Sequence, residues 1–492
     1  MPQAVLLIDP RDDVAVALTR LAPGESVTQN VAAAGEIPAG HKVALRAIAA
    51  GEPVRKYGWP IGHATADIAA GDHVHSHNLA TSLSGLEDYA YAPTRPEPLA
   101  LPQPATFQGY RRSNGRVGTR NEIWILCTVG CVARTAQKIA AEAERRFKGR
   151  VDGVHALTHP FGCSQLGGDL AATRTIIGAL AAHPNAGGVL ILGLGCESNQ
   201  LAALLEAAPH IEPERLRAFT AQAMEDEIEA GLAAVEALVA VAERDRREPC
   251  PVSDLVVGLK CGGSDGFSGL TANPVVGRIA DQVSAAGGTA ILTEIPEIFG
   301  AERLLMARAV DQAVFDDIAA VVNDFKSYFL SHGEPVSENP SPGNIEGGVT
   351  TLEEKSLGAV QKAGRGQVTQ VLRYGERVDR TGVVLLEAPG NDAVSSTALT
   401  AAGATVILFT TGRGTPLGFP APTLKLATNS GLAQRKPHWI DFDAGRVVSG
   451  QSLDDAADSL MRLVLETASG APTRAEDNGE REIALWKRGV TL

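Results

Sequence analysis

The sequence lacks any apolar run long enough to cross a membrane. Its apolar stretches, such as Gly188–Gly195, are strand-length and fall well short of the roughly 20 residues that a spanning helix needs. Near the start, Asp9, Arg11 and Asp12 interrupt the apolar residues, so no signal-peptide core of the usual length is present. We therefore expect a soluble protein of the cytoplasm.

Cysteine is scarce, and basic residues form no block. Six cysteines among 492 residues are too few for a disulfide framework, and in a reducing compartment they are better explained as buried residues or metal ligands. The net charge of −13 is spread along the chain, which argues against nucleic acid or an anionic membrane as a partner. A small molecule is the expected partner.

The chain length and the pattern of apolar runs and turns predict several domains in an α/β protein. Residues 1–91 hold short alternating apolar runs between Pro and Gly turns, a pattern typical of a small β-rich domain. Residues 92–105 include five prolines and predict an extended linker. We expect a central α/β domain over 106–340 and a C-terminal α/β domain over 341–492, divided at the turn-rich segment Glu338–Gly348.

Alternating strands and helices indicate mostly parallel sheets in both larger domains. The predicted strands include Ile123–Val129, Val151–Thr158, Gly188–Gly193, Asp254–Leu259, Ala290–Thr293, Gly382–Leu386 and Thr405–Thr410. The predicted helices include Arg134–Arg146, Asp169–Ala182, Gly269–Ala286 and Leu453–Thr467.

Three histidines stand at alternate positions in the first domain, at His73, His75 and His77. On a strand, alternate side chains point to one face, so the three imidazoles could converge on one ion or anion. Histidine is also a common metal ligand. A solvent-facing strand that carries histidines without function is the alternative.

Three loops place a cysteine beside glycine at the end of a predicted strand, at Cys163, Cys196 and Cys261. Loops at the carboxyl ends of parallel strands can meet at one site. Thiolates suit iron, zinc and iron–sulfur clusters. Simple burial is an equally good explanation of each cysteine alone. Cys127, Cys131 and Cys250 are interpreted as structural.

The glycine-rich loop after Lys260 lacks the spacing of a nucleotide-binding loop. It offers backbone N–H groups together with Ser264 and Asp265, which suits a carboxylate-bearing polyol. A nearby turn carries Asn344.

Arginines and carboxylates in other turns are further candidates. Arg116 and Arg120 could clamp a carboxylate, although salt bridges between domains explain them equally well. Glu294 and Glu297 follow a predicted strand and could move protons or bind metal. Helix capping explains Asp392 nearly as well as function does. Arg413 lies in a loop compatible with an anion.

Taken together, these segments resemble the altronate/galactarate dehydratase family over nearly the whole chain. The resemblance rests on the ordered motifs GYxRxxGRxGTRN, HPFGCSQ, GLGCE, KCGGSDGFSG, TEIPEIFGAE, NIEGG, APGND and TGRGTPLG. The first domain resembles the SAF-type domain of these enzymes, and its HVHSHN segment is closer to the altronate branch.

The resemblance implies an iron-dependent hydro-lyase that removes water from an aldonic or aldaric acid and forms a 2-keto-3-deoxy sugar acid. D-altronate is the expected substrate, and galactarate, another sugar acid or a related hydroxy-acid elimination is the alternative. A sugar-acid-binding protein without catalysis is a third reading. A homodimer is expected.

Residue roles follow from the motif positions. Cys163, Cys196, Cys261 and His75 are expected to bind iron, and the catalytic candidates are His73, His75, His77 and Lys260. The candidates for substrate binding are Arg116, Arg120, Ser264, Asp265 and Asn344, and Glu197 is a further candidate for hydroxyl contacts. Histidines favour a single Fe2+ ion, whereas three cysteines favour an iron–sulfur cluster, and both remain open.

Overall fold

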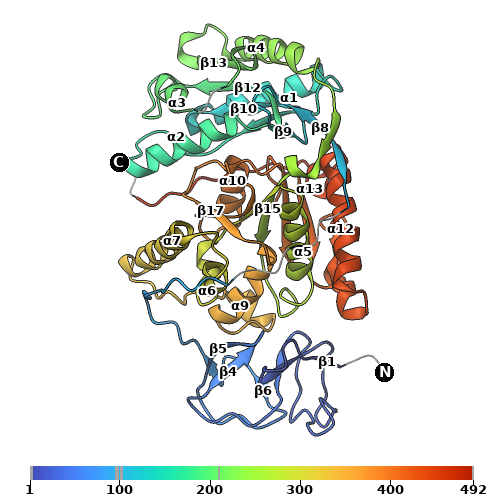
Figure 1. The fold of residues 1–492 in the computed structure, drawn as a ribbon. Coiled ribbons are helices and arrows are strands. Elements are labelled where there is room, and N and C mark those ends of the chain that lie inside the picture. The colour runs from blue at the N-terminus through green and yellow to red at the C-terminus, as the bar shows by residue number, and fades with distance from the viewer. Residues whose placement is uncertain (1–3, 95–98, 100–102, 209–210, 490–492) are drawn as a thin grey trace.

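The computed structural model describes residues 4–94, 99, 103–208 and 211–489. Figure 1 shows three parts stacked along one axis: a small strand-rich domain at one end, a large α/β domain in the middle and a second α/β domain at the other end. This arrangement confirms the predicted fold class. Within the described residues, no helix is long and apolar enough to span a membrane.

The N-terminal domain consists of two small antiparallel sheets. One has the order β1-β2-β3-β6 and the other β4-β5-β7. Their strands are β1 (Val5–Leu6), β2 (Val14–Ala17), β3 (Lys42–Ala44), β4 (Pro53–Lys56), β5 (Trp59–Ala64), β6 (His73–Val74) and β7 (Leu79–Ala80). The predicted β-rich domain is present.

The second domain is a four-stranded parallel sheet with the order β11-β10-β12-β13. Its elements are β10 (Glu122–Cys127), α1 (Ala133–Arg146), β11 (Val154–Leu157), α2 (Gly167–Ala181), β12 (Ala186–Gly193), α3 (Leu201–Ala207), β13 (Leu216–Thr220) and α4 (Glu227–Ala242). Alternate residues of β10 pack on opposite faces: Ile123 and Ile125 lie in the core with α1 and α4, and Trp124 and Leu126 lie in the core with α2.

The third domain contains a seven-stranded parallel sheet with the order β17-β18-β16-β15-β19-β20-β21. Its strands are β15 (Val256–Cys261), β16 (Thr289–Leu292), β17 (Val368–Leu372), β18 (Gly382–Leu386), β19 (Val406–Thr411), β20 (Thr423–Ala427) and β21 (Phe442–Asp443). Its main helices are α5 (Ala272–Ala285), α6 (Glu302–Met306), α7 (Gln312–Ser331), α8 (Pro342–Glu346), α9 (Leu352–Ala359), α10 (Asp392–Ala402), α11 (Ser430–Arg435), α12 (Leu453–Ala468) and α13 (Arg474–Asp477).

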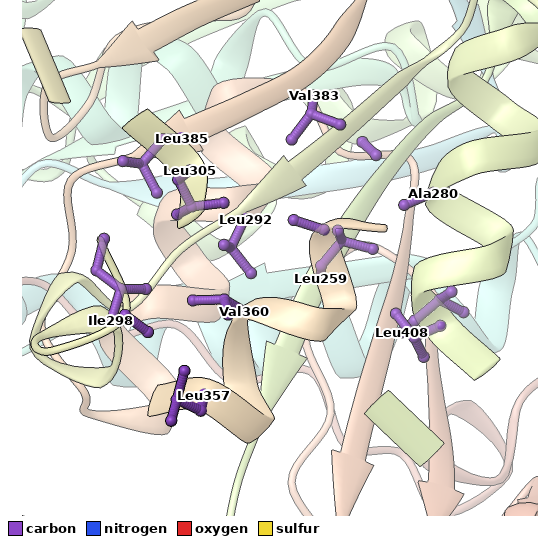
Figure 2. Packing of buried hydrophobic residues seen from close by; sticks show 14 of the residues in the cluster. Leu259, Ala280, Leu292, Ile298, Leu305, Leu357, Val360, Val383, Leu385 and Leu408 are labelled. Carbon is purple, nitrogen blue, oxygen red and sulfur yellow. The ribbon is translucent and has the colours of Figure 1, made fainter. Parts of the chain in front are cut away.

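The central strands of this sheet are apolar on both faces because helices cover both. Figure 2 shows Leu259 and Leu292, from two neighbouring strands, near Val360, which follows α9. Leu385 of the next strand and Leu357 of α9 belong to the same cluster. Leu408 of β19 lies near α5. Parallel strands buried on both faces are expected to be mainly apolar, and β15, β16, β18 and β19 are so apart from Lys260 and three threonines.

The predicted boundary at residue 340 is wrong. Strands β15 and β16, which we assigned to the central domain, pair with β19 and β18 of the presumed C-terminal domain. The third domain therefore begins between α4 and β15. A small antiparallel sheet joins the two α/β domains there, in the order β14-β8-β9, from β8 (Thr106–Arg111), β9 (Val117–Gly118) and β14 (Glu248–Pro251).

The segment after the N-terminal domain runs along the third domain. Asn323 of α7 donates to the Glu87 carbonyl at 2.9 Å, and the Thr94 N–H donates to the Ala307 carbonyl at 2.8 Å. Part of the predicted linker, residues 95–98 and 100–102, lies outside the described residues.

Candidate functional site

Four histidines gather on the face of the N-terminal domain that meets the third domain. His73, His75 and His77 are joined by His41, and we call these four the histidine cluster. Ring centroids lie 5.0 Å apart for His41 and His75, 5.2 Å for His73 and His75, and 5.6 Å for His73 and His77. The predicted convergence of the three alternating histidines is therefore present.

The reason that we gave for this convergence is only partly correct. Strand β6 ends at Val74, and residues 75–78 form a turn. The Asn78 side chain accepts from the His75 N–H at 2.9 Å and donates to the His73 carbonyl at 3.0 Å. The turn, rather than strand alternation, brings His77 beside His73.

Hydrogen bonds fix the orientation of these rings. His75 Nε2 lies 3.0 Å from the Ile345 carbonyl, and His41 Nε2 lies 3.2 Å from the Glu346 carbonyl. A carbonyl only accepts, so both Nε2 atoms carry the proton and both Nδ1 atoms keep a lone pair. His41 Nδ1 then accepts from His73 Nε2 at 3.0 Å.

His41, His73 and His75 have lowered pKa values, which favours their uncharged form near neutral pH. Burial, and then neighbouring His41 and His75, lower the pKa of His73 to about 4. Burial also lowers the pKa values of His41 and His75. Neutral imidazoles whose second nitrogen is oriented by a carbonyl are the form that metals bind.

The glycine-rich loop of the third domain is built for contact with the N-terminal domain. A Cβ placed on Gly266 would lie 1.9 Å from the Gly40 carbonyl oxygen, and one on Gly348 would lie 2.5 Å from the same atom. Only glycine allows this approach of two backbones. The loop therefore positions His41, which follows Gly40.

Lys260 is the penultimate residue of the buried strand β15 and joins two carboxylates. Its ammonium group donates to Asp392 Oδ1 at 2.7 Å, and it also contacts Glu294. Burial by itself lowers the pKa of Lys260, but the carboxylates of Glu294 and Asp392 outweigh it and raise the pKa above its ordinary value. Lys260 is fully buried, so it acts on a substrate only through Asp392.

Cys261 lies beside two glutamates and two further lysines. Its Sγ is 2.9 Å from Glu297 Oε2 and 2.7 Å from Lys362 Nζ, and Lys355 Nζ is 2.8 Å from Glu297 Oε1. Glu294 has a left-handed backbone with φ of 72°, a conformation that costs about 1–3 kcal/mol and often occurs at functional sites. We call these groups, with Lys260, the lysine–glutamate cluster.

Protonation in this cluster follows from burial and charge. Burial, and then the Glu297 carboxylate, raise the pKa of Cys261 to about 12 and that of Glu294 to about 7. Burial alone would raise the pKa of Glu297, but Lys355 and Lys362 outweigh it and lower the pKa to about 2. Of the two glutamates, Glu294 is therefore the one that can carry a proton.

The donor atoms of Cys261, Glu294 and Glu297 lie within 4.8 Å of one another. Three lysines nevertheless contact the same atoms, so three carboxyl groups (Glu294, Glu297 and Asp392) already face three ammonium groups (Lys260, Lys355 and Lys362). A buried set of this kind is balanced by hydrogen bonds and charge without a cation. This cluster therefore fits a metal poorly. The histidine cluster offers neutral imidazoles, but no three of its ring nitrogens lie within 4.8 Å of one another in this structure.

Asp392 and Arg413 flank the two glycines that follow Cys261. A Cβ on Gly262 would lie 2.7 Å from Asp392 Oδ2, and one on Gly263 would lie 3.1 Å from Arg413 Cβ. Both side chains are partly exposed, 34% for Asp392 and 47% for Arg413. Arg413 also pairs with Glu346, whose carbonyl faces His41. A cation for an acid group, a carboxylate and the histidines are thus brought to one junction.

Capping does not explain Asp392. The Asn391 side chain caps α10, where it accepts from the N–H groups of Ala393 and Val394 at 3.1 Å. Asp392 is left to bond Lys260, in keeping with a role at the site.

The three polar candidates of the loops shape the junction. The Asp265 carboxylate accepts from Thr428, Ser268 and Asn429 at 2.9–3.0 Å, so its acceptors are occupied by the protein. Asn344 donates to the Ser264 carbonyl at 2.8 Å and its oxygen accepts from Ser341. These contacts hold the glycine-rich loop against α8.

Arg116 and Arg120 lie at the other edge of the sheet. Arg120 pairs with Glu476 and donates to three carbonyls, and Arg116 donates to the Val378 carbonyl at 2.7 Å. A Cβ on Gly403, just before β19, would lie 3.0 Å from Arg116. Cys261 ends β15, one strand length of about 20 Å away. The structure gives both arginines contacts that join domains, so we leave them out of the proposed substrate site.

The structure does not bring Cys163 and Cys196 to Cys261. Both are exposed in loops of the second domain, whereas Cys261 is buried at the far edge of the third domain's sheet. Thr119, just after β9, donates to the Thr405 carbonyl before β19, so the second domain meets the opposite edge. The expected iron site of Cys163, Cys196, Cys261 and His75 is not assembled within the chain. Glu197 bonds Thr128 and the N–H groups of its own loop.

Several residues of the junction were missed because their partners are distant in sequence. His41, Lys355 and Lys362 lie in segments far from one another in the sequence and belong to no motif that we recognised. A charged residue within an apolar segment could have identified such lysines, because a buried charge needs a partner of opposite charge.

A cavity of about 780 Å3 lies elsewhere among the described residues. It is formed between α2, α7 and the C-terminal segment, with Tyr328, Tyr374 and Trp486 in its wall. No predicted site residue lines it, so its size alone does not mark the site.

Three family models match consecutive parts of the chain. The model described as "Altronate/galactarate dehydratase SAF domain" matches residues 3–82, "D-galactarate dehydratase/Altronate hydrolase, second domain" matches 109–243, and "D-galactarate/Altronate dehydratase, C-terminal" matches 252–491. These ranges agree with the three domains of the structure.

Curated relatives match over nearly the full length. An altronate dehydratase of Escherichia coli is 52% identical over 98% of both chains, and one of Bacillus subtilis is 47% identical over 100% of both. A galactarate dehydratase (L-threo-forming) of Escherichia coli is 35% identical over 88% of this chain and 86% of its own.

Proposed function

This chain belongs to the galactarate and altronate dehydratase family, and on that premise we propose that it removes water from D-altronate where its N-terminal and third domains meet. The product is 2-dehydro-3-deoxy-D-gluconate. The observation that carries this proposal is the 52% identity to an altronate dehydratase over 98% of both chains.

The reaction breaks the bond of C2 to its proton and that of C3 to its hydroxyl. The two leave as water, and the resulting enol becomes the 2-keto acid. The proton at C2 is a poor acid until the negative charge that develops on the neighbouring carboxylate is stabilised. The site must therefore hold the carboxylate, accept a proton and help the hydroxyl leave.

Arg413 holds the substrate carboxylate. Its guanidinium is half exposed and its only ion-pair partner among the described residues, Glu346, is itself 72% exposed. Exposed ion pairs contribute little to stability, so a substrate acid can replace Glu346 at small cost. The fork of guanidinium donors matches a carboxylate.

Asp392 accepts the proton, and Lys260 positions it. The ammonium group of Lys260 is fixed between Asp392 and Glu294, so it keeps the exposed carboxylate of Asp392 in place over Gly262. Glu294, with a pKa near 7, can take up the proton behind Lys260.

Iron is the metal that the family resemblance implies. His41, His73 and His75 would hold it only after their rings turn, because no three nitrogens of the histidine cluster lie within 4.8 Å of one another and His41 Nδ1 is bonded to His73 Nε2. The neutral imidazoles of all three, and the carbonyls that orient His41 and His75, support this assignment. Bound Fe2+ would supply a Lewis acid that stabilises charge on the substrate's oxygen atoms.

Location and assembly are part of the proposal. Six free cysteines are compatible with a reducing compartment such as the cytoplasm. A homodimer is proposed because two-fold dimers are the commonest soluble assembly. Light scattering on the purified chain would measure the number of subunits.

A panel of sugar acids tests the function. Iron-loaded protein is incubated with D-altronate, galactarate and other aldonates and aldarates, and the 2-keto-3-deoxy product is measured. D-altronate is expected to give the highest kcat/KM. A preference for galactarate would assign the chain to the other branch, and binding of a sugar acid without product would show a binding protein.

A further inference from the structure

Three exposed cysteines lie at neighbouring strand ends of the second domain, away from the proposed active site. Strand β10 lies between β11 and β12, and all three are parallel. Cys131, Cys163 and Cys196 occupy the loops that follow these three strands, and all three have free thiols. Because the carboxyl ends of parallel strands meet at one edge of a sheet, the three loops are neighbours.

These loops pack directly on one another. The Gly130 N–H donates to the Phe161 carbonyl at 2.8 Å, and the Asn199 N–H donates to the Gly162 carbonyl at 2.9 Å. The Ser164 N–H donates to Ser198 Oγ at 3.2 Å. The loop of Cys163 is thus bonded to the loops of both other cysteines.

The loop of Cys163 has a strained backbone conformation. Ser164, the next residue, has φ of 53°, a left-handed conformation that a non-glycine residue adopts at a cost of about 1–3 kcal/mol. A Cβ on Gly162 would lie 2.1 Å from the Thr128 carbonyl oxygen, so this loop must lie close against the end of β10. The backbone presents the thiol of Cys163 rather than burying it.

Two amide groups beside the cysteines point to a ligand. Gln222 Nε2 donates to Cys196 Sγ at 3.6 Å, an interaction that a sulfur bound to metal also accepts. Gln165, at the end of the Cys163 loop, is 94% buried, since only 6% of it is exposed. Its oxygen accepts from the Gly162 N–H, whereas its Nε2 has no partner within the described part of the chain.

We propose that Cys131, Cys163 and Cys196 hold an iron–sulfur cluster in the second domain. Thiolate sulfur is the ligand that such clusters prefer. The three Sγ atoms, all of which the structure describes, do not lie within 4.8 Å of one another. Two thiolates on one zinc ion are at most about 4.6 Å apart, since each Zn–S bond is about 2.3 Å. A cluster of several iron and sulfide ions accommodates thiolates that lie farther apart than two ligands of a single ion can.

Three thiolates leave one iron of a four-iron cluster without a protein sulfur. That iron is open to an oxygen ligand such as a hydroxyl or a carboxylate. The remaining cysteines do not compete for the cluster: Cys127 and Cys250 are buried in strands, and Cys261 is enclosed by the lysine–glutamate cluster.

The test measures iron and acid-labile sulfide in the full chain. Protein purified without oxygen is reconstituted with Fe2+, sulfide and a thiol reductant, freed of excess reagent, and examined for bound iron, labile sulfide, visible absorption and electron paramagnetic resonance after reduction. Cys131→Ser, Cys163→Ser and Cys196→Ser are compared with Cys250→Ser, whose sulfur lies in β14.

Wild-type protein and Cys250→Ser are expected to bind labile sulfide with an equal amount of iron, in addition to the Fe2+ proposed for the histidine cluster. Each of the other three variants is expected to lose the sulfide, the iron that accompanies it and the visible absorption, and to keep at most the iron of the histidine cluster. Circular dichroism verifies that all variants are folded. Iron without sulfide in the wild type, or sulfide retained in any two of the three variants, would overturn the proposal. Because none of these readouts is turnover, failure here leaves the proposed dehydration untouched.

Discussion

Lys42 of the N-terminal domain donates to Glu354 of α9 at 2.8 Å, and both side chains are buried. Lys56 donates to the other carboxylate oxygen at 2.7 Å. One carboxylate of the third domain thus anchors two lysines of the N-terminal domain. Lys42 directly follows His41 in the sequence, so this contact places the histidine cluster at the junction.

Glu354→Gln is expected to destabilise the protein by about 3–5 kcal/mol, because it leaves two buried lysines without a carboxylate. Denaturant unfolding measures the change. The matched control is Glu36→Gln, which breaks the exposed pair of Arg20 and Glu36 and should cost less than about 1 kcal/mol. Equal effects of the two variants would contradict a buried anchor.

The same carboxylate predicts a dependence on pH. Burial alone would raise the pKa of Glu354, but Lys42 and Lys56 outweigh it and hold the pKa far below its ordinary value of 4.5. A carboxyl group with a lowered folded pKa contributes stability above its unfolded pKa and loses it as the pH falls. The difference in Tm between wild type and Glu354→Gln should therefore shrink below about pH 4.5. A difference that stays constant there would exclude this linkage.

Gly266→Ala is expected to disturb domain contact, because the added Cβ would meet the Gly40 carbonyl oxygen at 1.9 Å. Neither the new Cβ nor the Gly40 carbonyl oxygen can move aside by a side-chain rotation. Overpacking of this kind typically costs about 1–3 kcal/mol of stability. Limited proteolysis of the segment after the N-terminal domain, together with turnover, measures the effect. Gly35→Ala, with no atom within 4 Å of the new Cβ, is the control and should behave as wild type.

Glu294→Gln is expected to lower kcat by about 10²–10⁴-fold, the usual range for loss of a group that transfers protons. KM should change little, because Arg413 holds the substrate. Lys260 keeps Asp392 as its partner, so the fold is expected to survive. A variant that keeps its kcat would exclude Glu294 from proton transfer.

Local patterns in the sequence predicted elements and motifs better than they predicted their assembly. The strands and helices of the second domain lie within a few residues of the expected ranges because each is set by its own apolar pattern. The boundary at residue 340 was wrong because parallel strands pair across long crossovers, and β15 and β19 are adjacent only in space.

In the candidate site too, local sequence patterns predicted neighbouring residues but not contacts between distant segments. His73, His75 and His77 are close in the chain, and their convergence could be predicted. The grouping of Cys261 with Cys163 and Cys196 could not be judged, because similar loops occur at the ends of two separate sheets. His41 and Lys362 reach the junction from distant segments, and no local pattern identifies them.

The most direct test of the account is the rate of 2-dehydro-3-deoxy-D-gluconate formation from D-altronate by His73→Ala and by His63→Ala. Both histidines belong to the N-terminal domain, but His63 lies outside the histidine cluster, beside Ser82. If the site lies at the junction, His73→Ala should lose about 100-fold or more in kcat/KM, and His63→Ala should retain wild-type turnover. Wild-type turnover by folded His73→Ala would contradict an active site formed by the histidine cluster and the third domain.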